Sequence, residues 1–439
     1  MCIWLQYPLL SKSGYLRSLV SEINVANADT VIHIKDIPGT TEAFVLCAKF
    51  CYGIAVTLNA FNVIAVRCAA QYLEMTEEME KGNLIFMIDY FLNSCIFRAW
   101  KDCIISLQST KLLLPWAEDL KLVATCIDSI ASMASVDQAK VTWSFTYTRV
   151  TNPSTLWPGI ISTNQNATPL DSNAAHQNMD EKKMAPSDWW VEDICQLDID
   201  LYHRVVSAIK SKGRIGSGVI WKALMAYAYK CLPTIKDQKM NLVPVDASYA
   251  DDYGDIEMVS KHRHSLEIIV SLLPSEKGSY SCTFMLKLLK VASLLEAALP
   301  LKKDLARRIG MQLDDASLND ILIPSFSYAN ESVYDVDMIQ SILEHFMARE
   351  TRPEVAPPCT KTGLIGEGGV IHETQSSTSS IISSSMLRVS KLVDAYLAEI
   401  AKDPNLTLSK FIGLAELVPG FARQVHDGLY RAIDVYLKV

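Results

Sequence analysis

Apolar residues recur at helical spacing along most of the chain, and residues 282–299 show this pattern best. Phe284, Leu288 and Val291 repeat at the helical period, and polar residues are confined to a narrow stripe. An apolar face this wide is typical of a helix buried between other helices. We therefore predict a buried helix over residues 282–299, which Pro300 should stop because proline cannot continue a helix.

The same spacing predicts helices in most of the remaining chain. They are expected over residues 11–20, 41–52, 59–73, 84–107, 117–134, 201–209, 219–232, 387–402, 408–417 and 421–437. A β-type run, Thr-Val-Ile-His-Ile-Lys, covers residues 30–35 and is followed by the turn residues Pro38 and Gly39. The pattern indicates a mostly α protein with an N-terminal α+β domain, followed by helices alone.

Shifts in composition divide the chain into two predicted domains. Residues 1–150 form the first, which ends in a helical extension, and residues 151–187 are a linker rich in Asn, Thr, Ser and Pro. A second, all-helical domain covers residues 188–439. Within it, the polar and acidic residues 233–262 predict a loop, and residues 351–385 are a low-complexity segment with a Ser/Thr tract.

Charge and hydropathy exclude two broad classes of function. The 439 residues carry a net charge of −8, which argues against nucleic-acid binding, since a basic patch supplies most of that affinity. No apolar run reaches the roughly 18 residues of a membrane span, and the first residues lack the basic leader of a signal peptide. We therefore expect a cytoplasmic protein without a transmembrane span.

The cysteines predict packing rather than chemistry. The chain has 11 of them without framework spacing, and the closest pair, Cys47 and Cys51, would share one face of a helix. Such residues usually are small buried apolar side chains in a reducing compartment.

No motif in the sequence predicts catalysis, a cofactor or a metal site. The segment from Gly213 to Gly218 resembles a phosphate-binding loop but lacks the Lys-Ser/Thr pair, so it favours a turn between helices. His262 and His264 could share a metal only in an extended segment, and a solvated loop is the simpler interpretation. We therefore expect a protein that is not an enzyme.

Two aromatic sites each allow two interpretations. The adjacent indoles of Trp189 and Trp190 could anchor the second domain into its core or form a binding surface. Arg423, Asp427 and Tyr430 fit the spacing of a tyrosine phosphorylation site, although Tyr430 could equally be a packing residue of a helix.

Strings along nearly the whole chain resemble one plant protein family. They include residues 8–16 (PLLSKSGYL), 47–53 (CAKFCYG), 188–194 (DWWVEDI), 334–337 (YDVD) and 428–438 (GLYRAIDVYLK). Together they resemble the plant BTB/POZ proteins of the non-phototropic-hypocotyl and root-phototropism family. The resemblance covers residues 7 to about 150 and 188–438, and by comparison with the family we expect the chain to be truncated at both ends.

The resemblance implies a fold and a set of partners. Members have an N-terminal BTB/POZ domain, here incomplete, then a plant-specific helical domain. They are linked to cullin-3 ubiquitin ligases as substrate adaptors, and to phototropin-type receptors in blue-light and auxin signalling. The implied partners are cullin-3, a protein substrate, a phototropin-type receptor kinase, and a second BTB domain in a dimer.

Cullin contact in BTB adaptors uses an apolar-x-Glu element, and Val20 with Glu22 fits that element here. Two alternatives stay open. The chain could be a signalling scaffold without ligase action, peripheral at the plasma membrane, or a truncated paralogue without function.

Overall fold

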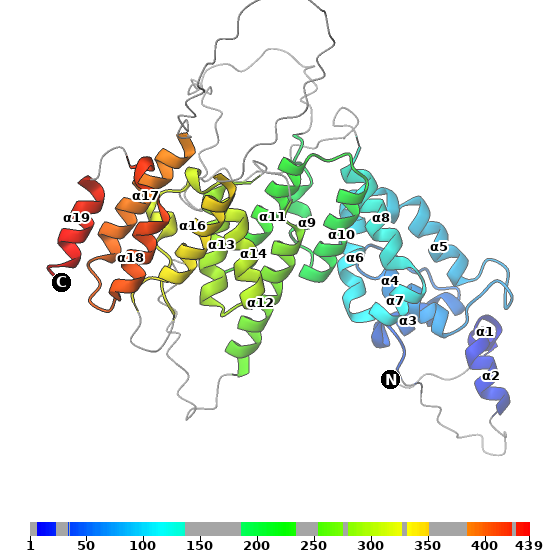
Figure 1. Ribbon diagram of the computed structural model, residues 1–439. Helices are drawn as coiled ribbons and strands as arrows, with labels where there is room; N and C mark the ends of the chain where they lie inside the picture. Colours follow the sequence, from blue (N-terminus) through cyan, green and yellow to red (C-terminus); the bar gives the residue numbers. More distant parts are fainter. Residues whose placement is uncertain are drawn as a thin grey trace, which may run out of the picture. The chain divides into compact units, whose positions relative to one another are not determined.

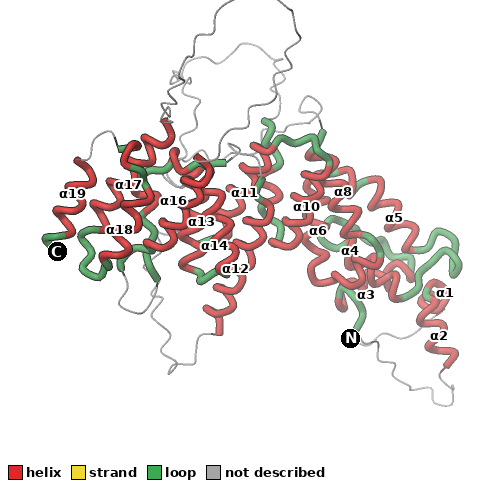
Figure 2. The backbone as a smooth tube through the Cα atoms, in the orientation of Figure 1, coloured by secondary structure: helices red, strands yellow, loops and turns green. Residues whose placement is uncertain are grey.

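The computed structural model describes two compact units, Met1–Val219 and Ile220–Val439 (Figure 1). The described residues are 7–22, 34, 36–136, 186–233, 253–274, 280–326, 332–350, 384–423 and 427–439. Figure 2 shows them as helices joined by loops. Their only β pairing is an isolated antiparallel bridge between Pro324 and Tyr334. The mostly α architecture is thus confirmed, whereas the predicted β run over residues 30–35 lies outside the described residues except for Ile34, which is in no strand.

Helices of the first unit surround α4. They are α1 (Tyr7–Lys12), α2 (Gly14–Glu22), α3 (Thr40–Cys51), α4 (Val63–Tyr72), α5 (Leu84–Ser94), α6 (Trp100–Ser109), α7 (Leu114–Asp119), α8 (Leu122–Ala134), α9 (Val191–Ile194) and α10 (Ile199–Ser211). Val63, Ile64 and Val66 of α4 are fully buried, and α4 contacts α3, α5, α6 and α7. The apolar spacing of α4 therefore supplies the centre of this core.

Two long predicted helices are each divided in the structure. The segment 84–107 breaks after Ser94 into a short 3₁₀ turn, Ile96–Arg98, before α6 begins. The segment 117–134 breaks at Lys121, whose φ of 58° is left-handed and reverses the chain between α7 and α8. Both predictions were wrong at these points because apolar spacing alone does not register a change in helix direction.

The second unit is a succession of packed helices. They are α11 (Ser217–Cys231), which begins at the unit boundary, α12 (Tyr253–Leu272), α13 (Cys282–Leu294), α14 (Leu299–Gly310), α15 (Leu318–Ile321), α16 (Val336–Glu350), α17 (Ser384–Ile400), α18 (Leu408–Leu417) and α19 (Asp427–Tyr436). Contacts run from α13 to α14, from α14 to α16, from α16 to α18 and from α17 to α19.

The burial predicted for α13 is confirmed, but its end is not. Nine of its residues are buried, and the other four, Thr283, Lys287, Lys290 and Leu294, form one half-buried stripe. It ends at Leu294, because Glu296 adopts a left-handed φ of 50°. The N–H of Ala297 then donates to Ala292 O at 2.8 Å, as in a Schellman motif. Pro300 therefore does not stop this helix but lies in the first turn of α14.

The loop predicted over residues 233–262 is shorter than expected. Helix α12 begins at Tyr253, so residues 253–262 are helical. The prediction was wrong because the first turns of α12 are polar. They are stabilised by side-chain pairs such as Glu257–Lys261 and by the buried Leu266 and Ile269 further along the same helix. Nearly all of the predicted linker 151–187 and of the low-complexity segment 351–385 lies outside the described residues.

The first unit extends beyond the predicted linker and includes α9 and α10. Helix α9 contacts α6, and α10 contacts α8. Trp190 is fully buried, and the ring of Trp189 lies 4.7 Å from that of Trp100. The tryptophan pair is therefore an anchor, as one interpretation proposed, but it anchors this segment to helices that precede it in the chain.

Candidate partner-binding surfaces

A short helical pair at the N-terminal end is fixed to the loop that follows α4. Ser13 Oγ donates to Leu73 O at 2.6 Å, and Asn83 Nδ2 donates to Lys12 O at 2.9 Å. Gly14 permits the close approach, since a Cβ there would lie 2.7 Å from the Glu74 carboxylate. These contacts hold the start of α2 and leave its far end outside the core.

Val20 and Glu22 lie at that far end. Val20 is half-buried, and Glu22 is the exposed last residue of α2. The structure therefore brings the two predicted contact residues onto the same terminal turn, where a partner could cover the valine and pair with the carboxylate.

An apolar face on α5 is a second exposed surface, which the sequence analysis did not identify. Phe86, Met87 and Tyr90 are exposed, Tyr90 at 69%, while the opposite face of α5 is buried. Arg67 of α4 holds the helix in this orientation, with its Nε 2.7 Å from Asp89 Oδ1. The sequence does carry a signal for this surface, because α5 has apolar residues on both of its faces. Packing against the core requires apolar residues on one face only.

The first unit also has an apolar hollow between α3 and α4. Its volume is about 400 Å³, and its lining includes Ala43, Leu46, Val66 and the exposed Phe61. It contains only one ionisable side chain, Glu42, so its chemistry suits an apolar partner group.

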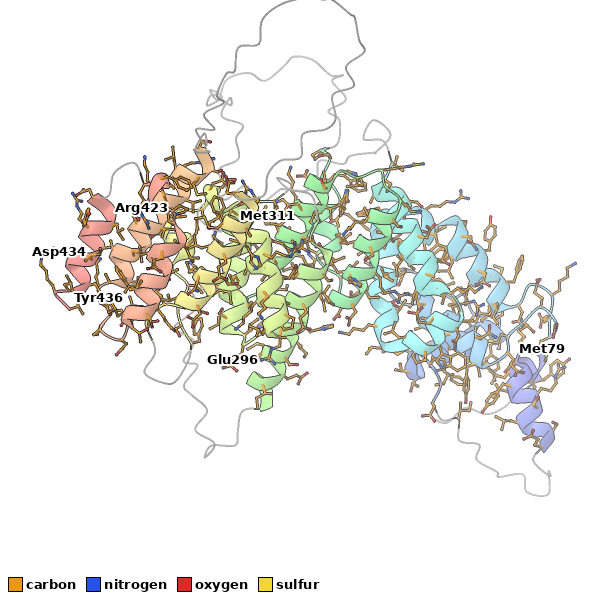
Figure 3. The ribbon with its side chains drawn as sticks, viewed as in Figure 1. Met79, Glu296, Met311, Arg423, Asp434 and Tyr436 are labelled. Carbon is orange, nitrogen blue, oxygen red and sulfur yellow. The ribbon has the colours of Figure 1, made fainter. Side chains whose placement is uncertain are left out.

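The predicted phosphorylation pattern does not form one exposed site. Tyr430 is 68% exposed on α19, which is more than a packing residue would be. Arg423, however, is buried, and its Nε donates to Asp394 Oδ1 of α17 at 3.0 Å. It also donates to Val418 O and Ala415 O at the end of α18. The arginine therefore stabilises the fold and is not accessible to a kinase (Figure 3).

Seven of the nine described cysteines are buried, as predicted, whereas the loop predicted around His262 and His264 is wrong. Burial raises the pKa of the Cys47 thiol to about 12 and that of the Cys51 thiol to about 11, so neither is a thiolate at neutral pH. His262 and His264 are helical rather than in a loop, and residues two apart on a helix point to different sides. Within the described ranges, no group of three His, Cys, Asp or Glu residues could hold a metal ion.

Comparison with known proteins identifies the family. A model of the NPH3 family matches residues 188–439. In Arabidopsis thaliana, the BTB/POZ domain-containing protein At1g67900 and the phototropic-responsive NPH3 family protein NPY2 are each 44% identical to this chain over 99% of its length, and the NPH3 family protein NPY1 is 41% identical over 99%. The chain belongs to the NPH3 family, which confirms the resemblance inferred from its sequence strings.

The chain spans between 62% and 66% of the length of these three relatives. No solved structure matches it. Of the helices that the structure describes, none has both the length and the apolar composition to cross a membrane.

Proposed function

We propose that this protein is a non-enzymatic adaptor that brings a protein substrate to a cullin-3 ubiquitin ligase in plant phototropic signalling. The observation that carries the proposal is the similarity over 99% of the chain to proteins named for a BTB/POZ domain and for phototropic responsiveness. The first unit would hold the cullin, and the second unit, which lies within the family match, would bind the substrate.

The cullin contact is proposed at the end of α2 and on α5. BTB adaptors use an apolar-x-Glu element together with a later helix, and Val20, Glu22 and the exposed face of α5 supply both here. Tyr90 and Phe86 are the anchors that would dominate the binding energy, because buried aromatic residues usually do so at protein interfaces. Glu22 would fix the register of the complex.

The test is direct binding to an N-terminal cullin-3 fragment, measured by calorimetry with this chain and with NPY2 in parallel. We expect micromolar or tighter binding, and a loss of at least about tenfold, or 1.4 kcal/mol, in the double variants Val20→Ala/Glu22→Ala and Phe86→Ala/Tyr90→Ala. Leu112→Ala is the matched control, because Leu112 is 93% exposed and lies on neither surface.

Each outcome discriminates between the proposals. If NPY2 binds the fragment and this chain does not, the adaptor function is wrong for this chain. If both bind but the variants do not weaken binding, the contact lies elsewhere in the first unit. If neither binds, while a phototropin-type receptor is captured by this chain, the non-ligase scaffold becomes the better proposal. For either function, we propose that the protein acts in the cytoplasm or peripherally at the plasma membrane.

A further inference from the structure

The second unit contains a polar pocket that the proposed cullin contact does not use. It has a volume of about 230 Å³. Its key lining residues are Ser293, Glu296, Lys302, Phe326, Tyr334 and Asp335, and we call it the Asp335 pocket. Glu296, labelled in Figure 3, comes from the turn between α13 and α14. The pocket thus joins segments that are distant in sequence.

In the described part of the chain, the carboxylate of Asp335 uses only one of its two oxygens in a hydrogen bond. Its Oδ1 accepts the N–H of Met338 at 3.0 Å and so caps α16. Within the described residues its Oδ2 has no hydrogen-bond donor. Burial raises the pKa of Asp335, although the Met338 N–H and the neighbouring Lys302 and Lys410 oppose the shift. The charged form therefore lacks part of the stabilisation that it would have in water.

Two buried hydroxyl groups near this carboxylate also lack partners. Ser293 is 6% exposed and Tyr396 is fully buried. Neither Ser293 Oγ nor Tyr396 OH has a hydrogen-bond partner in the described structure. Ser293 lines the pocket. Burial first, and then the charge of Asp335, raise the pKa of Tyr396, so its hydroxyl lies close to the same carboxylate. Buried polar groups are normally satisfied, so these two hydroxyl groups are exceptions within the described fold.

The charges favour a cationic guest over an anionic one. The lining carries the carboxylates of Glu296, Asp335 and Asp337 and the ammonium groups of Lys302 and Lys410. Lys410 is paired with Asp337 at 2.9 Å. The remaining groups sum to one negative charge, because Lys302 offsets only one of the two other carboxylates. A phosphate or carboxylate guest would therefore meet net repulsion.

The groups in the pocket that remain available to a guest are hydrogen-bond acceptors, and they favour a cation that carries several donors. Asp335 Oδ2 and the Glu296 carboxylate can each accept a hydrogen bond, and a guanidinium offers five donors in a planar fork. The lining also includes the aromatic rings of Phe326 and Tyr334, on which a guanidinium can stack. The volume is below the roughly 300 Å³ of most small-molecule sites and suits one side chain.

We propose that the Asp335 pocket binds an arginine side chain presented by a partner protein. The inference rests on the proposed adaptor function only in identifying that partner as the substrate. Glu296 and Asp335 bind the guanidinium, and the aromatic rings contact its face. Lysine fits less well because its ammonium is a compact point charge without the planar fork of donors that a guanidinium has.

The test uses the whole chain and two small probes. N-acetyl-arginine amide is titrated and followed by calorimetry, and N-acetyl-citrulline amide is the control because it has nearly the same shape without the charge. We expect a dissociation constant of about 1 mM for the arginine probe, which is typical of one side chain, and at least about tenfold weaker binding of citrulline.

Three variants separate the pocket from general electrostatics. Asp335→Asn keeps an oxygen to cap α16, and Glu296→Gln keeps the shape of that side chain; each should weaken arginine binding by about tenfold. Glu416→Gln makes the same charge change at an exposed position on α18 outside the pocket and should leave the affinity unchanged. The melting temperature of each variant shows that it is folded.

Several results would overturn the proposal. They are no saturable arginine binding up to about 10 mM, equal binding of citrulline, unchanged affinity in Asp335→Asn, or preferential binding of N-acetyl-glutamate amide. Cullin-3 fragment binding by Asp335→Asn is measured alongside and should be unchanged. A failure of the pocket is thereby distinguishable from a failure of the adaptor function.

Discussion

The indole Nε1 of Trp100 donates a hydrogen bond of 2.7 Å to Asp193 Oδ2. The two residues lie on either side of the long segment 137–185, which is outside the described residues. The bond is supported by the ring contact between Trp100 and Trp189, whose centroids are 4.7 Å apart. It ties the start of the family-matched region to a helix that comes well before it.

Trp100→Phe should destabilise the first unit by about 1–2 kcal/mol, since it keeps an aromatic ring but removes a hydrogen bond to a charged group. Asp193→Asn should cost less, because an amide oxygen can still accept. Urea unfolding of both variants and of the double variant measures their coupling. Strictly additive costs would show that the hydrogen bond does not form in solution.

Gly310→Ala should destabilise the second unit by about 1–3 kcal/mol, since overpacking forces the backbone to shift. A Cβ at this position would lie 2.7 Å from His345 Cβ and 2.9 Å from Ile342 O, both on α16. The matched control is Gly218→Ala in α11, where a Cβ would meet no atom within 4 Å. Thermal unfolding compares the two, and equal melting temperatures would refute the close contact of α14 with α16.

Arg423→Met should destabilise the second unit by about 3–5 kcal/mol, because it leaves the carboxylate of Asp394 buried without a counter-charge. Lys438→Met removes the exposed pair with Asp434 and should change stability by less than about 0.5 kcal/mol. Denaturant titration of both variants is the measurement. A small loss for Arg423→Met would mean that water reaches Asp394 in the folded protein.

Cys95 should be the fastest of the described cysteines to react with iodoacetamide, because it is exposed while burial raises the pKa of Cys68 to about 11 and that of Cys282 to about 12. We expect a difference of at least about tenfold at pH 7.5, since the thiolate is the reactive form. Peptide mass spectrometry at timed intervals measures it. Urea should remove the difference, and labelling of Cys282 as fast as Cys95 without urea would contradict the packing of α13.

Asp335 should make stability depend on pH in a direction opposite to that of an ion-paired aspartate. Its pKa is raised above 3.8 in the folded state, so the folded protein holds this proton more tightly than the unfolded chain. Its contribution to stability therefore falls as the pH rises from about 3.8 through the raised value, and the penalty is complete above it. Asp335→Asn should gain more stability over the native protein at pH 7 than at pH 3.5.

Urea midpoints of the two proteins at both pH values provide the test. Added N-acetyl-arginine amide should reduce the advantage of Asp335→Asn at pH 7, because a bound cation stabilises the charged carboxylate. An advantage that is greater at pH 3.5 would show that the carboxylate is stabilised rather than desolvated in the folded state.

Local patterns predicted the helices well wherever packing and sequence agree. Helix α18 has the expected bounds, 408–417, and the burial of most of α13 follows from its wide apolar face. The break at Lys121 could not be predicted, because a left-handed lysine has no signal in the sequence. The early start of α12 was missed since its first turns are polar and only its later residues are buried.

The candidate sites depend on contacts that sequence does not encode locally. Val20 and Glu22 were found as a short motif, whereas the exposed face of α5 required knowing which side of that helix is buried. Ser293 and Asp335 line one pocket although more than 40 residues separate them in the chain. The arrangement of Glu296 and Asp335 around one hollow is a property of the fold and has no local signal in the sequence.

The inclusion of α9 and α10 in the first unit determines where members of this family could exchange parts. A chimera joined at residue 188, where the family match begins, would unite Trp189, Trp190 and Asp193 of one parent with Trp100 and α8 of the other. A crossover near residue 219 would keep these partners together. We therefore expect functional chimeras to be joined near residue 219 rather than at residue 188. We also expect substitutions in α9 to be accompanied by substitutions in α6.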